Sequence, residues 1–224
     1  KTYISQYADV VLGYYLLAGC VCIMLAQLKE KKRFTFLGGL FLGFLSFTKP
    51  EGLIAACLLI GLTGLYFVTT QKKFFNPYAS SFLTGTAITL LPSLLFYLVI
   101  APENITSVNG LISTAHPSTG ARLKTIILFY GVEFISAKWV GLWFLLFALV
   151  LINAKQNFKR PIWLLPCFLL CYLSTIAFYY FVNTHFEIRW WLSVTLHRIL
   201  ASLLPLFFWW VLFGLRTPSS DETV

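Results

Sequence analysis

Apolar residues run along this chain in long stretches, interrupted only by short clusters of charge and by turn residues. A bilayer core about 30 Å thick requires roughly 20 apolar residues per helix, so each stretch between charges predicts a membrane-spanning helix. The predicted spans are residues 9–28, 34–48, 53–70, 81–100, 139–153 with an amphipathic lead-in from residue 125, 162–182 and 199–215. The pattern therefore predicts an all-α fold, a polytopic transmembrane helical bundle of about seven spans.

The composition supports a membrane protein. Hydrophobic residues make up 58% of the chain, charged residues 11%, and the mean hydropathy is +0.80, whereas a soluble domain carries about 25% charged residues. The net charge of +9 is spread over the segments between apolar runs, which favours basic membrane loops and argues against a nucleic-acid partner. The five cysteines all fall in apolar runs, and we interpret them as small buried residues.

The basic segments also predict the orientation in the membrane. Residues 29–33 ("KEKKR"), 71–73 ("QKK"), 154–160 ("AKQNFKR") and the tail after residue 215 fall on one side if every predicted span crosses. This side carries most of the Lys and Arg residues and is therefore expected to be cytoplasmic, with the N-terminus extracytoplasmic and the C-terminus cytoplasmic. Because the chain begins at Lys1 within an outer loop, we expect residues 1–224 to form a single transmembrane domain, the middle and C-terminal part of a larger protein.

The segment "TKPEG" interrupts the apolar run of residues 34–70, whose only charged residues are Lys49 and Glu51. Pro50 has no amide proton and disfavours helical geometry at Lys49, so a helix is predicted to end there, and Gly52 is expected to let the chain turn. The two halves then form a hairpin with its tip on the outer side. A solvated tip accounts for these residues without any function, and a single re-entrant segment is a further alternative that places one basic loop on the wrong side.

Polar residues gather at the outer ends of the predicted spans, although charge at membrane depth is unfavourable and marks candidate functional sites. The long loop 101–124 and the segment 183–198 lie on the same side and are expected to roof a polar cavity. All three histidines, His116, His185 and His197, are outside as well. The gathered side chains are those of Asp9, Lys49, Glu51, Glu187, Arg189, His197 and Arg198.

Three of these segments carry a resemblance to a known family. "YAD" before an apolar helix, then "LGGLFLGFLSFTKPEGL", then a late "LHRILASLLPL" resemble the glycosyltransferases of the C superfamily that use polyprenyl-phosphate sugars, such as protein mannosyltransferases and the lipid A aminoarabinose transferase. The resemblance implies that Asp9 opens a helix facing the catalytic cavity, and that Tyr7 and His197 belong to the substrate-binding residues. The family's catalytic acid in the first outer loop has no counterpart in this chain.

The chemistry of such a transfer assigns roles to the remaining residues. A base must deprotonate the acceptor hydroxyl, and a cation or metal ion must hold the phosphate as it leaves with growing negative charge. Asp9 and Glu51 are candidates for base, metal ligand or acceptor-orienting acid; Lys49, Arg189 and Arg198 are candidates for holding phosphate. The structural alternatives are an acid favoured by the helix dipole for Asp9 and an interfacial anchor for Arg198.

The function predicted from the chain is therefore transfer of a sugar from a polyprenyl-phosphate-linked donor to a glycan, lipid or protein acceptor at the extracytoplasmic face. Membrane lipids are further partners, a divalent cation is a candidate cofactor, and the expected location is a bacterial inner membrane, or the endoplasmic reticulum in a eukaryote. Two alternatives stay open: a transporter or lipid flippase subunit, and a non-catalytic assembly protein. A transporter more often places ionisable residues or broken helices near the middle of the membrane.

Overall fold

The computed structural model describes residues 3–71, 77–100, 119–158, 163–183 and 187–215, and these residues form helices and short connections without any strand. The all-α prediction is confirmed for this part of the chain. The helices are α1 (Tyr3–Lys29), α2 (Lys32–Thr48), α3 (Pro50–Gln71), α4 (Pro77–Leu95) with the π-helix η1 (Phe96–Ile100), α6 (Thr119–Ile135), the 3-10 turn η2 (Ala137–Trp139), α7 (Leu142–Ile152), α8 (Ala154–Asn157), α9 (Leu164–Val182) and α10 (Ile188–Gly214).

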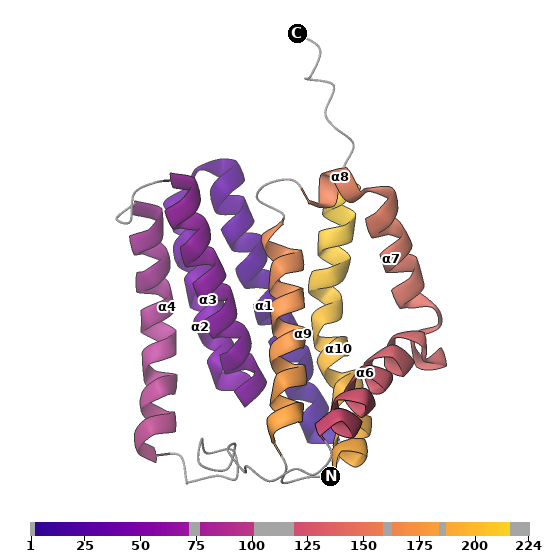
Figure 1. The fold of residues 1–224 in the computed structure, drawn as a ribbon. Helices are drawn as coiled ribbons and strands as arrows, with labels where there is room; N and C mark the ends of the chain where they lie inside the picture. The colour runs from indigo at the N-terminus through magenta and orange to yellow at the C-terminus, as the bar shows by residue number, and fades with distance from the viewer. Residues whose placement is uncertain (1–2, 72–76, 101–118, 159–162, 184–186, 216–224) are drawn as a thin grey trace.

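The long helices stand side by side and alternate in direction, so the bundle has two distinct ends (Figure 1). Helix α2 packs against α1, α3 and α4, whereas α10 packs against α1, α6 and α7, and α3 contacts α9. The start of α1, the break between α2 and α3 and the start of α10 lie at one end, which is drawn at the bottom of Figure 1. We call this the Asp9 end; it is the end at which the candidate site is found.

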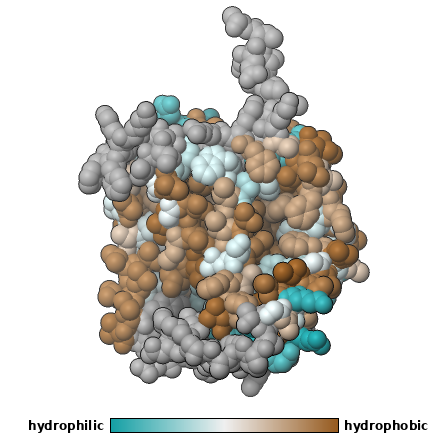
Figure 2. Space-filling view, viewed as in Figure 1, coloured by the Kyte–Doolittle hydropathy of each residue, from teal (hydrophilic) through white to brown (hydrophobic). Residues whose placement is uncertain are grey.

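Among the described residues, four helices are long and apolar enough to cross a membrane, within residues 8–29, 77–95, 164–182 and 188–214, or up to five if α6, η2 and α7 form one bent span. Apolar side chains also cover the middle of the face shown in Figure 2, with hydrophilic residues toward its ends. Leu151 and Ile152 are each 76% exposed and Leu170 is 70% exposed. Such surfaces belong in lipid rather than in water, so the chain has the character of a membrane protein.

Close helix packing on one side of the bundle depends on small residues, as is usual between membrane helices. A Cβ atom added to Gly43 of α2 would lie 1.8 Å from Oγ1 of Thr89 in α4, so only glycine permits this approach. The Thr89 hydroxyl lies 3.3 Å from the carbonyl oxygen of Leu40. Helices α2 and α4 therefore approach each other closely at Gly43 and Thr89.

The break predicted at "TKPEG" is confirmed, with a different role for its glycine. Helix α2 ends at Thr48, Lys49 is extended (φ −163°, ψ 163°) and α3 begins at Pro50. The prediction that Gly52 makes the turn was wrong, because Gly52 lies inside the first turn of α3. A Cβ atom there would meet the Leu45 carbonyl oxygen at 2.2 Å, so Gly52 allows α3 to pack closely against the end of α2.

Two predicted boundaries differ from the structure. Helix α10 begins at Ile188 rather than residue 199, so most of the predicted outer segment 183–198 is helical. The charge of Arg198 predicts a helix boundary there, but in the structure this charge is paired with Asp9 of α1. The lead-in before residue 139 is a separate helix, α6, at 107° to α7, and the bend contains Val140 and Gly141 in the left-handed region.

Candidate functional site

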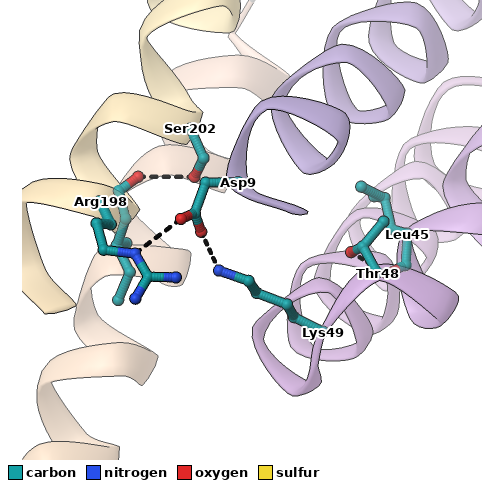
Figure 3. A network of polar contacts seen from close by, with 7 residues as sticks. Asp9, Leu45, Thr48, Lys49, Arg198 and Ser202 are labelled. Carbon is teal, nitrogen blue, oxygen red and sulfur yellow. Dashed lines mark hydrogen bonds and ion pairs between the residues drawn. The ribbon is translucent and has the colours of Figure 1, made fainter. Parts of the chain in front are cut away.

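Asp9 is the centre of the candidate site, because its carboxylate joins three separate elements (Figure 3). One oxygen, Oδ1, accepts a hydrogen bond from Nζ of Lys49, at the break between α2 and α3. The other, Oδ2, accepts from Nε of Arg198 in α10 at 2.8 Å. The side chains of Asp9, Lys49 and Arg198 are 12%, 17% and 20% exposed. We call these three residues the Asp9 cluster.

The register between α1 and α10 brings Asp9 to Arg198. One turn further along both helices, a Cβ atom added to Gly13 would lie 2.7 Å from the carbonyl oxygen of Ser202, so the backbones approach closely there. Residues four apart share a helix face, so Asp9 lies one turn from Gly13 on the same face of α1, and Arg198 lies one turn from Ser202 on the same face of α10. The Ser202 hydroxyl bonds to its own helix at Ile199, 2.8 Å away, and does not compete for Asp9.

The helix break places Lys49 in the site. With Lys49 extended between two helices, its side chain leaves the hairpin and reaches α1, instead of pointing along a helix face. The amide protons of Gly52 and Leu53 bond to the Lys49 carbonyl at 2.9 and 3.2 Å and start α3. The tip of the hairpin is therefore partly buried against a neighbouring helix and is not a freely solvated turn.

Glu51 lies beside the Asp9 cluster without an ion pair in the described part of the chain. It is partly buried in the first turn of α3, where an acid is favoured by the helix dipole. Its charge reaches the hydroxyl groups of three tyrosines of α9, which packs against α3; these are Tyr172, Tyr179 and Tyr180. Glu51 thus lies two residues from Lys49, in the first turn of the helix that packs against α9.

Glu187 and Arg189 lie apart from the Asp9 cluster. The Glu187 carboxylate caps α10 by accepting from the backbone amides of Trp190 at 2.6 Å and Arg189 at 3.0 Å, and these bonds hold its pKa below the ordinary value. The Arg189 side chain is exposed. Nine residues separate it from Arg198, about two and a half turns, so the two arginines lie on opposite helix faces. Of the two arginines predicted as candidates for holding phosphate, the structure thus brings Arg198 to the Asp9 cluster and places Arg189 on another face of α10.

The histidines and Tyr7 contribute little that the structure describes. His197 is half-buried in α10, with Nδ1 buried and unbonded among the described residues, and its main electrostatic neighbours are Lys138 and Glu133 beside the α6–α7 bend. Tyr7 lies in α1, but its side chain is outside the described part. His116 and His185 also lie outside the described residues.

The residues of the site do not form a cation-binding set. Within the described part of the chain there is no group of three or more His, Cys, Asp and Glu side chains suited to a metal ion. Both oxygens of Asp9 are engaged by cationic side chains. Among the described residues, the donors that a divalent cation requires are therefore not assembled around Asp9, and the positive charge beside Asp9 comes from Lys49 and Arg198.

An apolar groove of about 300 Å³ lies between α7, α9 and α10. Leu200 and Leu203 line it near the middle of α10, and Phe207 and Trp210 line it further along; the remaining lining residues are Phe134, Trp143, Phe147, Val150, Phe158, Pro166, Leu169, Leu170 and Leu173. Of the four aromatic residues at positions 207–210, Phe207 and Trp210 line this groove.

No family model, curated protein or solved structure matches the chain. The function must therefore be inferred from the site itself.

Tyr172 is the residue near the site that sequence reasoning missed. Its side chain is fully buried (0% exposed), and its hydroxyl group has no hydrogen-bond partner among the described residues. The charges of Glu51 and Asp9 both reach that hydroxyl. In the sequence Tyr172 is one of 11 tyrosines, and only the packing of α9 against α3 distinguishes it. The sequence feature that could have indicated Tyr172 is its polar hydroxyl group within an apolar run.

Proposed function

We propose that the chain forms the catalytic membrane domain of a glycosyltransferase that moves a sugar from a polyprenyl phosphate to an acceptor hydroxyl at the extracytoplasmic face. The proposal includes seven spans, with the Asp9 end of the bundle facing outward. The observation that carries it is the Asp9 cluster, a carboxylate shared by a lysine and an arginine from two other elements. It unites two groups suited to phosphate with one suited to act as a base.

The reaction requires a base and a cationic site in close proximity. In the proposed reaction the acceptor hydroxyl gives its proton to the carboxylate of Asp9, and its oxygen forms a bond to C1 of the sugar. The bond between C1 and the phosphate oxygen breaks, and its electron pair stays on that oxygen. Lys49 and Arg198 stabilise the phosphate dianion that leaves. Arg198 can present two parallel hydrogen bonds to phosphate, and Lys49 adds a compact charge.

The ion pairs of Asp9 define an order of binding in this proposal. While Lys49 and Arg198 hold the carboxylate, both of its oxygens are occupied by hydrogen bonds from these two side chains. A phosphate that takes over both cations releases Asp9 to accept a proton. Donor binding therefore precedes activation of the acceptor. The apolar groove that Phe207 and Trp210 line offers a place for part of a prenyl chain within the bundle.

One observation favours a second candidate, a transporter or lipid flippase subunit. Arg198 lies eleven residues into α10, and an ion pair between two membrane helices is also typical of transport proteins. Under this reading the same cations bind a lipid phosphate that is moved across the bilayer without bond cleavage.

One experiment tests both candidates. The full-length protein is reconstituted in vesicles with a polyprenyl-phosphate sugar and candidate acceptors, and both free polyprenyl phosphate and lipid transfer between leaflets are measured. Release of polyprenyl phosphate that depends on Asp9 supports the transferase. Transfer of intact lipid between leaflets without release contradicts it and supports the transporter.

A further inference from the structure

The side chain of Tyr172 has an unusual position for a tyrosine in a membrane bundle. Its hydroxyl group is buried and unpartnered in the described structure, and a buried polar group without a hydrogen bond destabilises the folded state. The hydroxyl groups of two other tyrosines have hydrogen-bond partners: Tyr130 donates to the Leu173 carbonyl at 3.2 Å, and Tyr180 bonds to the Thr195 hydroxyl. Phenylalanine would fill the same space as Tyr172 without this unfavourable burial.

The surroundings of Tyr172 connect it to the Asp9 cluster. The ring of Tyr172 is stacked on that of Phe168, one turn earlier in α9, with centroids 5.6 Å apart and planes inclined at 26°. This contact fixes the direction of the ring. The charges of Glu51, from α3, and of Asp9, from α1, both reach the hydroxyl. Both carboxylates therefore act electrostatically on this buried, unpartnered hydroxyl group.

We propose that Tyr172 and Glu51 form the subsite for the sugar of the donor, an inference that rests on the proposed function. The sugar is bonded through C1 directly to the phosphate, so it must lie next to the side chains that hold the phosphate. The Tyr172 hydroxyl donates a hydrogen bond to a sugar oxygen, and the Glu51 carboxylate accepts one from a sugar hydroxyl. When the donor phosphate binds Lys49, the Lys49 side chain leaves Asp9, and this movement makes room for the sugar beside Glu51. Tyr172 thereby contributes to specificity for the donor.

The test separates recognition of the sugar from recognition of the phosphate. Affinities of the purified full-length protein are measured for bare polyprenyl phosphate and for the same lipid bearing mannose, glucose or aminoarabinose. Wild-type protein is expected to bind one sugar-bearing lipid more tightly than the bare lipid. Tyr172→Phe is expected to bind the bare lipid like wild type and the preferred donor about five- to tenfold more weakly, the effect of one hydrogen bond. Its melting temperature is expected to equal or exceed that of wild type.

Tyr130→Phe is the matched control, because it removes a hydroxyl group that bonds, within the described structure, to the backbone carbonyl of Leu173. It is expected to lower the melting temperature slightly and to leave the preference for the sugar unchanged. Equal losses for both lipids in Tyr172→Phe, or a wild type that prefers no sugar, would overturn the subsite while leaving the phosphate site intact. A wild type that fails to bind bare polyprenyl phosphate would instead overturn the proposed function and the subsite with it.

Discussion

Arg198 donates a hydrogen bond from Nε to Oδ2 of Asp9 at 2.8 Å, although the two residues are 189 positions apart in the chain. This contact joins the first and last helices of the described structure near the end of the bundle where α2 and α3 meet. It also explains how an arginine is accommodated eleven residues inside a long apolar helix, because a paired charge is far less unfavourable there than an isolated one.

Replacing Asp9 with Asn tests the base. Asn keeps the shape of the side chain but accepts no proton, so turnover of the full-length enzyme is expected to fall at least about tenfold, the scale of general base catalysis. The melting temperature is also expected to fall, because Lys49 and Arg198 lose their counter-charge. Steady-state kinetics and a thermal melt measure the two effects. Unchanged turnover would reduce Asp9 to a residue that stabilises the start of α1.

Replacing Lys49 with Gln tests the phosphate site. If Lys49 holds the phosphate, donor binding is expected to weaken more than about tenfold, above about 1.4 kcal/mol. Glu51→Gln is the comparison on the same hairpin, and it is expected to lower turnover or acceptor use more than affinity for the bare lipid phosphate. Equilibrium binding to purified protein decides the question, and wild-type affinity in Lys49→Gln would leave the hairpin tip without a role in the site.

Gly13→Val tests the register between α1 and α10. A Cβ atom at Gly13 would already lie 2.7 Å from the Ser202 carbonyl oxygen, so the larger side chain must push the helices apart and strain the Asp9–Arg198 contact. We expect a loss of about 1–3 kcal/mol in unfolding free energy, as for overpacked cores, together with lower activity. Gly61→Val in α3 is the matched control, since a Cβ atom there meets nothing within 4 Å. Equal stability of the two variants would contradict the close approach.

The cap of α10 gives a prediction for pH. Hydrogen bonds from the Trp190 and Arg189 amides lower the pKa of Glu187 in the folded state. The stabilisation by this group is therefore complete above its unfolded pKa, about 4.3, and is lost as the pH falls through the lower, folded pKa. Lower protection of these two amides against hydrogen exchange, relative to the intrinsic rate at each pH, is expected as the pH falls through that range. Glu187→Gln should remove this pH dependence, and its persistence would assign it to another group.

Cysteine labelling tests the proposed orientation. In a background without the five native cysteines, single cysteines at Glu30 and Phe158 are expected to react only from the cytoplasm, and those at Lys138 and Glu187 only from outside. All four positions are exposed in the structure, so a lack of reaction reports the side of the membrane rather than burial. Labelling of Glu187 from the cytoplasm would contradict the placement of the Asp9 end at the outer face.

The sequence was informative where a single residue determines local geometry. Pro50 marks the end of α2 because proline constrains the residue before it, and alternation of the helices brings Asp9, Lys49 and Arg198 to one end. The start of α10 was misplaced because a charge marks a helix boundary only when it is unpaired, and the partner of Arg198 comes from the other end of the chain. The role of Tyr172 depends on how α9 packs against α3, which no local pattern records.

The distance in the chain between Asp9 and Arg198 also has a consequence for biosynthesis. At about 5–20 residues per second, a ribosome needs about 10 to 40 s after translating Asp9 to reach Arg198, 189 residues later. Asp9 is present in the nascent chain throughout this interval, and Lys49 is added early in it. Lys49 is therefore the first counter-ion available to Asp9. Arg198 completes the pairing only when α10 is inserted. Insertion of α10 would thus be the step that commits the bundle to its final arrangement.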